Sequence, residues 1–149
     1  MNKRWLCLLV ALFLFLFPSQ GCGQKDPVER YENQTFGVQM ELPAAWKGHY
    51  DIQEDDTPQF QRLMIGFLYP PSWWGILGWI EKRPVQQWEA EGRGELIPTE
   101  YKMLGETDGY VYVLVFPGDV YYDPENAEQT RLYEEMRNDL LNTVRWKFS

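Results

Sequence analysis

The feature that most constrains the fold of this chain is the run of residues 110–116, Tyr-Val-Tyr-Val-Leu-Val-Phe, in which no position is clearly polar. A strand that is apolar on both faces needs a covering layer on each side, so we expect this segment inside a sheet. Thr107-Asp108-Gly109 separates it from a second segment, residues 101–106, and Asp-Gly between two such segments is a strong hairpin signal. The sequence therefore predicts a central hairpin and requires other elements to cover it.

Several further segments have the pattern of strands. Residues 35–42 alternate between apolar and polar positions, which indicates a strand with one buried face. Residues 59–69 and 73–80 are rich in apolar residues, and Pro70-Pro71 between them marks a connection, because paired prolines cannot lie inside a sheet. We also predict a shorter strand over residues 49–53, a short helix over residues 84–91, and a terminal strand or packed segment at residues 146–148.

A C-terminal helix over residues 124–144 is the covering element that the sequence marks most clearly. Asp123 is placed to cap it, and Pro124 occupies the first helical position. Its apolar residues recur at spacings of three and four and form one stripe: Leu132, Tyr133, Met136, Leu140, Leu141 and Val144. We therefore predict an α+β domain, a largely antiparallel β-sheet covered by helices, with a long amphipathic helix at its C-terminus.

Residues 1–21 have the three parts of an export signal: a basic start, an apolar run over residues 5–17, and a small-residue exit that ends at Gly21. The apolar run is shorter than the roughly 20 residues that span a bilayer. Gly21-Cys22 resembles the end of a bacterial lipobox, although Ser19 stands where that motif has an aliphatic residue. The resemblance implies a lipid on Cys22 and a cell-membrane location on the extracytoplasmic face. An ordinary secretory signal cleaved nearby and an uncleaved leader are the alternatives.

The division that follows is a lipoprotein signal peptide over residues 1–21, Cys22 with a flexible tether over residues 22–30, and one domain over residues 31–149. Cys7 would leave with the leader, so the mature domain has no thiol besides Cys22 and forms no disulfide. The leader carries two basic residues and no acidic ones, so the net charge of −8 for the whole chain becomes −10 for residues 22–149. Such an acidic surface repels nucleic acid and anionic lipid headgroups, so the sequence disfavours binding to either one through a basic patch.

Three groups of residues form a pattern that occurs in known domains: Phe36-Gly37-Val38 with Leu42-Pro43-Ala44-Ala45-Trp46-Lys47-Gly48, residues 101–105 with 108–112, and residues 117–120 with the closing helix. Through them the chain resembles a group of small uncharacterised domains in secreted proteins and lipoproteins of Gram-positive bacteria, over most of residues 35–148. The opening strand with its Leu-Pro and Trp-Lys pattern also resembles the start of PsbP-like domains. That resemblance implies an antiparallel sheet packed between helices, and it implies no functional residue.

Candidate catalytic and metal-binding residues are few. His49 is the only histidine, and Ser72 lies in no Gly-x-Ser-x-Gly motif. The acids Asp119, Asp123, Glu125 and Glu128 cluster before the last helix but lack the spacing of a calcium loop, and helix capping accounts for two of them. We therefore predict no catalytic residue, no metal site and no cofactor.

Trp73, Trp74 and Trp79 form the most unusual segment of the chain. If they are exposed, their indoles provide a surface for sugar rings of the cell wall, for the membrane interface or for a partner protein. If they are buried, they serve the core. We predict a non-enzymatic cell-envelope lipoprotein domain that is held at the membrane through Cys22 and binds an envelope protein partner. The alternatives are an envelope enzyme that acts on cell-wall or small-molecule substrates through carboxylates, and a structural spacer domain.

Overall fold

The computed structural model describes residues 28–56, 61–71, 73–95, 97 and 99–149. The predicted leader, Cys22 and most of the predicted tether lie outside these residues. The elements, in chain order, are β1 (Val28–Asn33), β2 (Val38–Pro43), the 3-10 helix η1 (Ala44–Trp46), β3 (Tyr50–Asp56), β4 (Gln61–Tyr69), β5 (Trp73–Pro84), α1 (Val85–Ala90), β6 (Tyr101–Thr107), β7 (Tyr110–Val115), α2 (Ala127–Asn142) and β8 (Arg145–Phe148).

The strands form two antiparallel sheets. The large sheet has the order β3-β4-β5-β7-β6, and the small sheet has the order β1-β2-β8. β7 lies between β5 and β6, as its lack of polar positions predicts, and the β6–β7 turn places Asp108 (φ 51°) and Gly109 (φ 79°) in the left-handed region. The predicted Asp-Gly hairpin is therefore confirmed.

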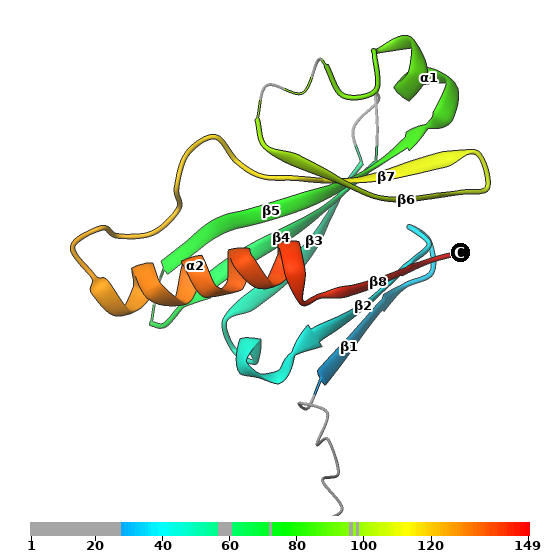
Figure 1. The fold of residues 1–149 in the computed structure, drawn as a ribbon. Helices are drawn as coiled ribbons and strands as arrows, with labels where there is room; N and C mark the ends of the chain where they lie inside the picture. The colour runs from blue at the N-terminus through cyan, green and yellow to red at the C-terminus, as the bar shows by residue number, and fades with distance from the viewer. Residues whose placement is uncertain (1–27, 57–60, 72, 96, 98) are drawn as a thin grey trace, which may run out of the picture.

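The main core lies between the two sheets and α2. Figure 1 shows the small sheet and α2 together on one side of the large sheet, with α2 alongside the end where β4 meets β5. Tyr112 and Leu114 of β7 contribute to this core with Met40 of β2, and α2 adds Tyr133 and Leu140. The hydroxyl of Tyr133 donates to the Ile76 carbonyl at 2.9 Å, which joins α2 to β5.

A second, smaller cluster covers the opposite face of β7. Val111, Val113 and Val115 alternate with the core residues of the same strand and pack against Trp88 of α1 and the half-buried Trp79. α1 and the segment after it thus cover one end of the outer face, and the small sheet with α2 covers the inner face. Both faces of β7 are buried, which is the arrangement that its sequence demands.

The predicted fold class, an α+β domain whose sheet is covered by helices in the manner of PsbP-like domains, is wrong. The described chain is β-rich, with 49% of it in strands and 22% in helices, and much of the inner face of the large sheet is covered by a second sheet. The prediction fails at β1, which begins at Val28, inside the segment assigned to the tether. β1 pairs with β2 along its whole length, and β2 also pairs with β8. A segment as polar as Val-Glu-Arg-Tyr-Glu-Asn can form an edge strand because one of its faces and one of its edges remain in water.

The two sheets also meet along both pairs of edges. Next to β3, the Asn33 amide of β1 donates to Glu54 at 2.5 Å, and burial, followed by the nearby Glu29 carboxylate, raises the pKa of Tyr50. At the other side the Phe148 ring of β8 stacks on Tyr112 with 4.2 Å between ring centroids and lies against β6. The domain is therefore a small sandwich with contacts between neighbouring edges.

α2 confirms the predicted C-terminal helix but begins three residues later than its sequence pattern indicated. Asn126 is the N-cap, and its side chain accepts from the backbone of Gln129 at 3.0 Å. Asp123 instead accepts from the backbone of Glu125 at 2.9 Å and stabilises the turn before the helix. Within the described ranges, neither helix has the length and apolar character needed to cross a bilayer.

Candidate functional site

Trp73 and Trp74 are both exposed, at 40% and 44%, but they lie on opposite faces of β5. The indole Nε1 of Trp73 donates to the Tyr121 carbonyl at 2.9 Å, on the side where α2 packs. The indole of Trp74 lies over Gly66 of β4, on the outer side: a Cβ atom at Gly66 would be 2.9 Å from its Nε1. The two tryptophans therefore cannot belong to one binding surface.

Trp79 lies on the same face as Trp74. A β-bulge between β4 and β5 sets this arrangement, since Ile65 pairs with Gly78 while the next residue, Gly66, pairs with Ile76. Without that shift, Ile76 and Trp79 would point to opposite sides, because side chains alternate along a regular strand. The predicted set Trp73, Trp74 and Trp79 is thus divided by the structure, with two members together and Trp73 apart.

The outer apolar patch, as we name it, consists of the outward-facing apolar residues of β4 and β5. They alternate with core residues of the same strands and pair across them, Leu68 with Trp74 and Met64 with Trp79. Trp74 is exposed and the others are half-buried. The members are Met64, Leu68, Trp74, Ile76 and Trp79. Sequence reasoning missed Met64, Leu68 and Ile76, because only the strand register shows which face each residue takes.

Two contacts hold Trp79 in place at the end of this patch that is nearest to α1. Its Nε1 donates to Glu81 at 2.8 Å, and the Arg62 guanidinium lies 5.5 Å from its ring centroid. Glu81 is 3% exposed and pairs with Arg83 at 2.5 Å, and Arg83 reaches Glu91 beyond α1 at the same distance. This network fixes the indole before any partner arrives, which reduces the entropy lost on binding.

The rim of the outer apolar patch is acidic along β3. Asp51 pairs in register with Gly66 and Asp55 with Arg62, so both carboxylates stand beside the patch on the neighbouring strand. Gln53 lies between them, and its amide donates to Asp51 at 2.7 Å. An apolar centre with a polar rim is the usual composition of a protein interface.

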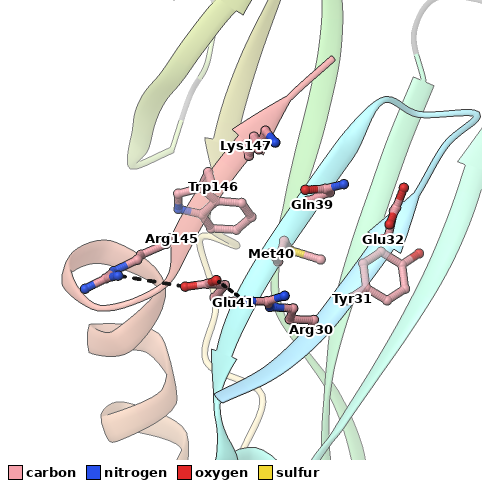
Figure 2. A pocket seen from close by; sticks show the side chains of 9 residues that line it. All are labelled: Arg30, Tyr31, Glu32, Gln39, Met40, Glu41, Arg145, Trp146 and Lys147. Atoms are coloured by element: carbon pink, nitrogen blue, oxygen red, sulfur yellow. Dashed lines mark ion pairs between the residues drawn. The ribbon is translucent and has the colours of Figure 1, made fainter. Parts of the chain in front are cut away.

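A second notable surface is the outward face of the small sheet, where a pocket of about 430 Å³ lies over the three strands (Figure 2). Glu41 of β2 stands between two guanidinium groups, 3.5 Å from Arg30 of β1 and 3.9 Å from Arg145 of β8. The next row across the strands contains Gln39 and Lys147, together with Glu32. The fold therefore places Arg30 on the same face as Arg145 and Lys147, although Arg30 is far from both of them in the sequence.

A smaller pocket of about 210 Å³ lies between α1 and β6. Trp88 forms part of its lining, with the exposed side chains of Tyr101 and Met103. Its acids are Glu89, which pairs with Arg93 at 3.1 Å, and Glu106. His49 lines neither this pocket nor the one on the small sheet.

The candidate catalytic and metal-binding residues that the structure describes do not meet in one site. The Nδ1 atom of His49 lies 3.2 Å from the Leu68 carbonyl, at the start of β3. Glu128 of the acidic cluster accepts from the Tyr69 hydroxyl at 3.4 Å. Within the residues that the structure describes, no three histidine, cysteine or acidic side chains are close enough to hold a metal ion. Ser72 and Cys22 lie outside the described residues.

Comparison with protein-family models, with curated proteins and with solved structures found no match to this chain. The resemblance to small secreted domains of Gram-positive bacteria therefore stays a prediction. The outer apolar patch and the outward face of the small sheet remain the candidate functional surfaces of the described domain.

Proposed function

We propose that this chain is a lipid-anchored cell-envelope domain that binds a protein partner through the outer apolar patch. The observation that carries the proposal is the position of Trp74, a large aromatic side chain left 44% exposed on a sheet face among half-buried apolar neighbours. Tryptophan is enriched at the energetic centres of protein interfaces, because it buries a large area at a low cost in conformational entropy.

The form of the patch favours a protein over a small molecule. The two pockets described above lie elsewhere, and the patch is a strand surface of the kind that a complementary protein surface can cover. The acidic rim formed by Asp51 and Asp55 favours a partner with an apolar centre flanked by basic side chains, since opposite charges at a rim accelerate association. The net charge of −10 over residues 22–149 favours the same partner and disfavours nucleic acid.

The anchor in this proposal is Cys22, which lies six positions before the start of β1. An extended chain of that length reaches about 20 Å, so a lipid on Cys22 would hold the domain close to the extracytoplasmic surface of the membrane. Binding of an envelope partner would then take place beside the bilayer.

The proposal is tested with a photoreactive amino acid placed at Ile76, within the patch, in cells that express the full chain. The protein crosslinked at this position is identified, purified and titrated against the wild-type chain and two variants. We expect Trp74→Ala to weaken the affinity by about 30-fold or more, as for a central interface tryptophan.

Trp73→Ala is the matched control, because Trp73 is nearly as exposed but lies on the other face of β5. We expect its affinity to stay within about threefold of the wild-type value, as for residues outside an interface. Equal affinities for the wild-type chain and the Trp74→Ala variant would contradict the proposal, as would a loss of the same size in both variants.

A further inference from the structure

The outward face of the small sheet differs in charge from the rest of the domain. Three cations stand on it, Arg30, Arg145 and Lys147, against the two acids Glu32 and Glu41 (Figure 2). This face therefore has a net positive charge, whereas residues 22–149 together have a net charge of −10. The domain is polarised, with this face as a positive region on an acidic molecule.

The two arginines remain available to a ligand. Their side chains are 80% and 73% exposed, and their distances to Glu41, 3.5 Å and 3.9 Å, exceed the roughly 2.8 Å of a charge-assisted hydrogen bond. Guanidinium groups bind phosphate in a bidentate manner, and two of them on either side of one strand can contact neighbouring phosphates. Lys147 adds a third cation two positions along β8 from Arg145.

The chain also enters the domain at this face. Arg30 is two residues after Val28, the first residue of β1, which is about 7 Å along a strand. Val28 is itself exposed, and it pairs with Pro43 at the end of β2. The helix η1 and the exposed Lys47 after it therefore lie at the same end of the small sheet. A chain of six residues from Cys22 thus brings this end and its cations within reach of the lipid headgroups.

We propose that the outward face of the small sheet, through Arg30, Arg145 and Lys147, rests on the phosphate groups of anionic phospholipids beside the anchor. This inference rests on the lipid anchor of the proposed function and adds an orientation to it. The outer apolar patch belongs to the large sheet and faces away from the small one, so the membrane-bound domain presents the patch to the envelope space. Opposite faces of the sandwich then have separate tasks.

The test uses the full chain purified from membranes and reconstituted into two kinds of vesicle, one of phosphatidylcholine alone and one that also contains phosphatidylglycerol. The Gln39→Cys variant places a thiol in the middle of the outward face of the small sheet. The Gln53→Cys variant places one on the outer side of the large sheet. Because Cys7 leaves with the leader and Cys22 carries the lipid, the introduced thiol is the free one. Its labelling rate with a membrane-impermeant maleimide is measured.

We expect the Gln39→Cys variant to react about fivefold or more slowly in the anionic vesicles than in the neutral ones, and to recover at about 0.5 M salt, since each cation near a membrane contributes a screened attraction. The Gln53→Cys control should react equally in both vesicles. Adding Arg30→Gln and Arg145→Gln to the Gln39→Cys variant should restore fast labelling in the anionic vesicles.

Fast labelling of the Gln39→Cys variant in both kinds of vesicle would overturn the inference. Equally slow labelling in both would overturn it too, because protection would then not depend on anionic lipid. A parent chain that neither vesicle retains, or whose own Cys22 reacts with the maleimide, would instead show that the anchor is absent. That result would overturn the proposed function at its anchor and this inference with it, whereas the first two results would leave the anchor intact.

Discussion

Glu81 shows how a single buried charge organises the outer side of the large sheet. Its carboxylate, 3% exposed, accepts from the Trp79 indole and pairs with Arg83, whose side chain continues to Glu91 after α1. Glu81 and Arg83 of β5 together thus join the patch residue Trp79 to the end of α1. A buried carboxylate is tolerated because its oxygens are paired with charged and polar donors.

Replacing this carboxylate should therefore destabilise the domain strongly. We expect Glu81→Gln to lower the free energy of unfolding by about 3 kcal/mol, because it leaves guanidinium charge in a buried layer without its central acid. Urea-induced unfolding measures the change. The control is Glu135→Gln, which removes the exposed pair with Arg131 (2.6 Å) and should cost under about 0.5 kcal/mol. Costs of similar size for the two variants would contradict the prediction.

Tyr133 should make the stability of the domain depend on pH in the alkaline range. Burial is the largest cause of a pKa raised from 10.0 to about 12. Because the folded state holds the proton more tightly than the unfolded state, this contribution is complete below pH 10 and is lost as the pH rises from 10 to 12. We expect Tyr133→Phe to lower stability by about 1 kcal/mol at pH 8, through loss of the hydrogen bond to Ile76, and to show a shallower decline above pH 10. Denaturant titrations at several pH values measure the free energy of unfolding of both proteins. If it declined equally steeply in the wild-type chain and in Tyr133→Phe between pH 10 and 12, Tyr133 would not be the source of the pH dependence.

At the scale of elements, the β6–β7 hairpin depends on its glycine for backbone reasons alone. Gly109 has φ 79°, and a Cβ atom at this position would meet nothing within 4 Å. Gly109→Ala should therefore cost about 1 kcal/mol of stability purely through the left-handed conformation. Gly118→Ala, at an exposed loop position without a positive φ, should cost less than half as much. Thermal unfolding of both variants checks this, and an unchanged midpoint for Gly109→Ala would refute it.

The elements that the sequence predicted well are those whose signals are local. The Asp-Gly turn, the proline pair between β4 and β5, and the apolar stripe of α2 each depend on residues close together in the chain. β1 was missed for the opposite reason. Its strand conformation depends on pairing with β2, and nothing in its polar sequence distinguishes such an edge strand from a linker.

The candidate site was less predictable than the elements. The sequence singled out Trp73, Trp74 and Trp79 because tryptophan is rare, but the β4–β5 bulge decides which of them share a face. A bulge is a relation between two strands and leaves at most a weak local signal, here Gly75 and Gly78. The positive face of the small sheet was also missed, since Arg30 and Arg145 are brought together only when β1 and β8 pair with β2.

At the scale of the whole molecule, the location that we propose depends on one residue outside the folded domain. Cys22→Ser should release the protein from the membrane fraction into the soluble extracytoplasmic fraction, because a serine accepts no thioether-linked lipid. Fractionation followed by immunoblotting measures this, and the Ser19→Ala variant, which keeps the cysteine, should stay at the membrane. Continued retention of the Cys22→Ser variant would point to an uncleaved leader.

The position of β8 has a consequence for when this domain can fold. Val38 of β2 pairs with Phe148 of β8, so the small sheet joins the first two strands of the domain to its eighth. If the protein is exported N-terminus first, β2 has its final neighbour only after β8 has crossed the membrane. The chain would thus remain unfolded during its passage, which a narrow translocation channel requires. Its native structure would form only after export, when β8 pairs with the distant β2.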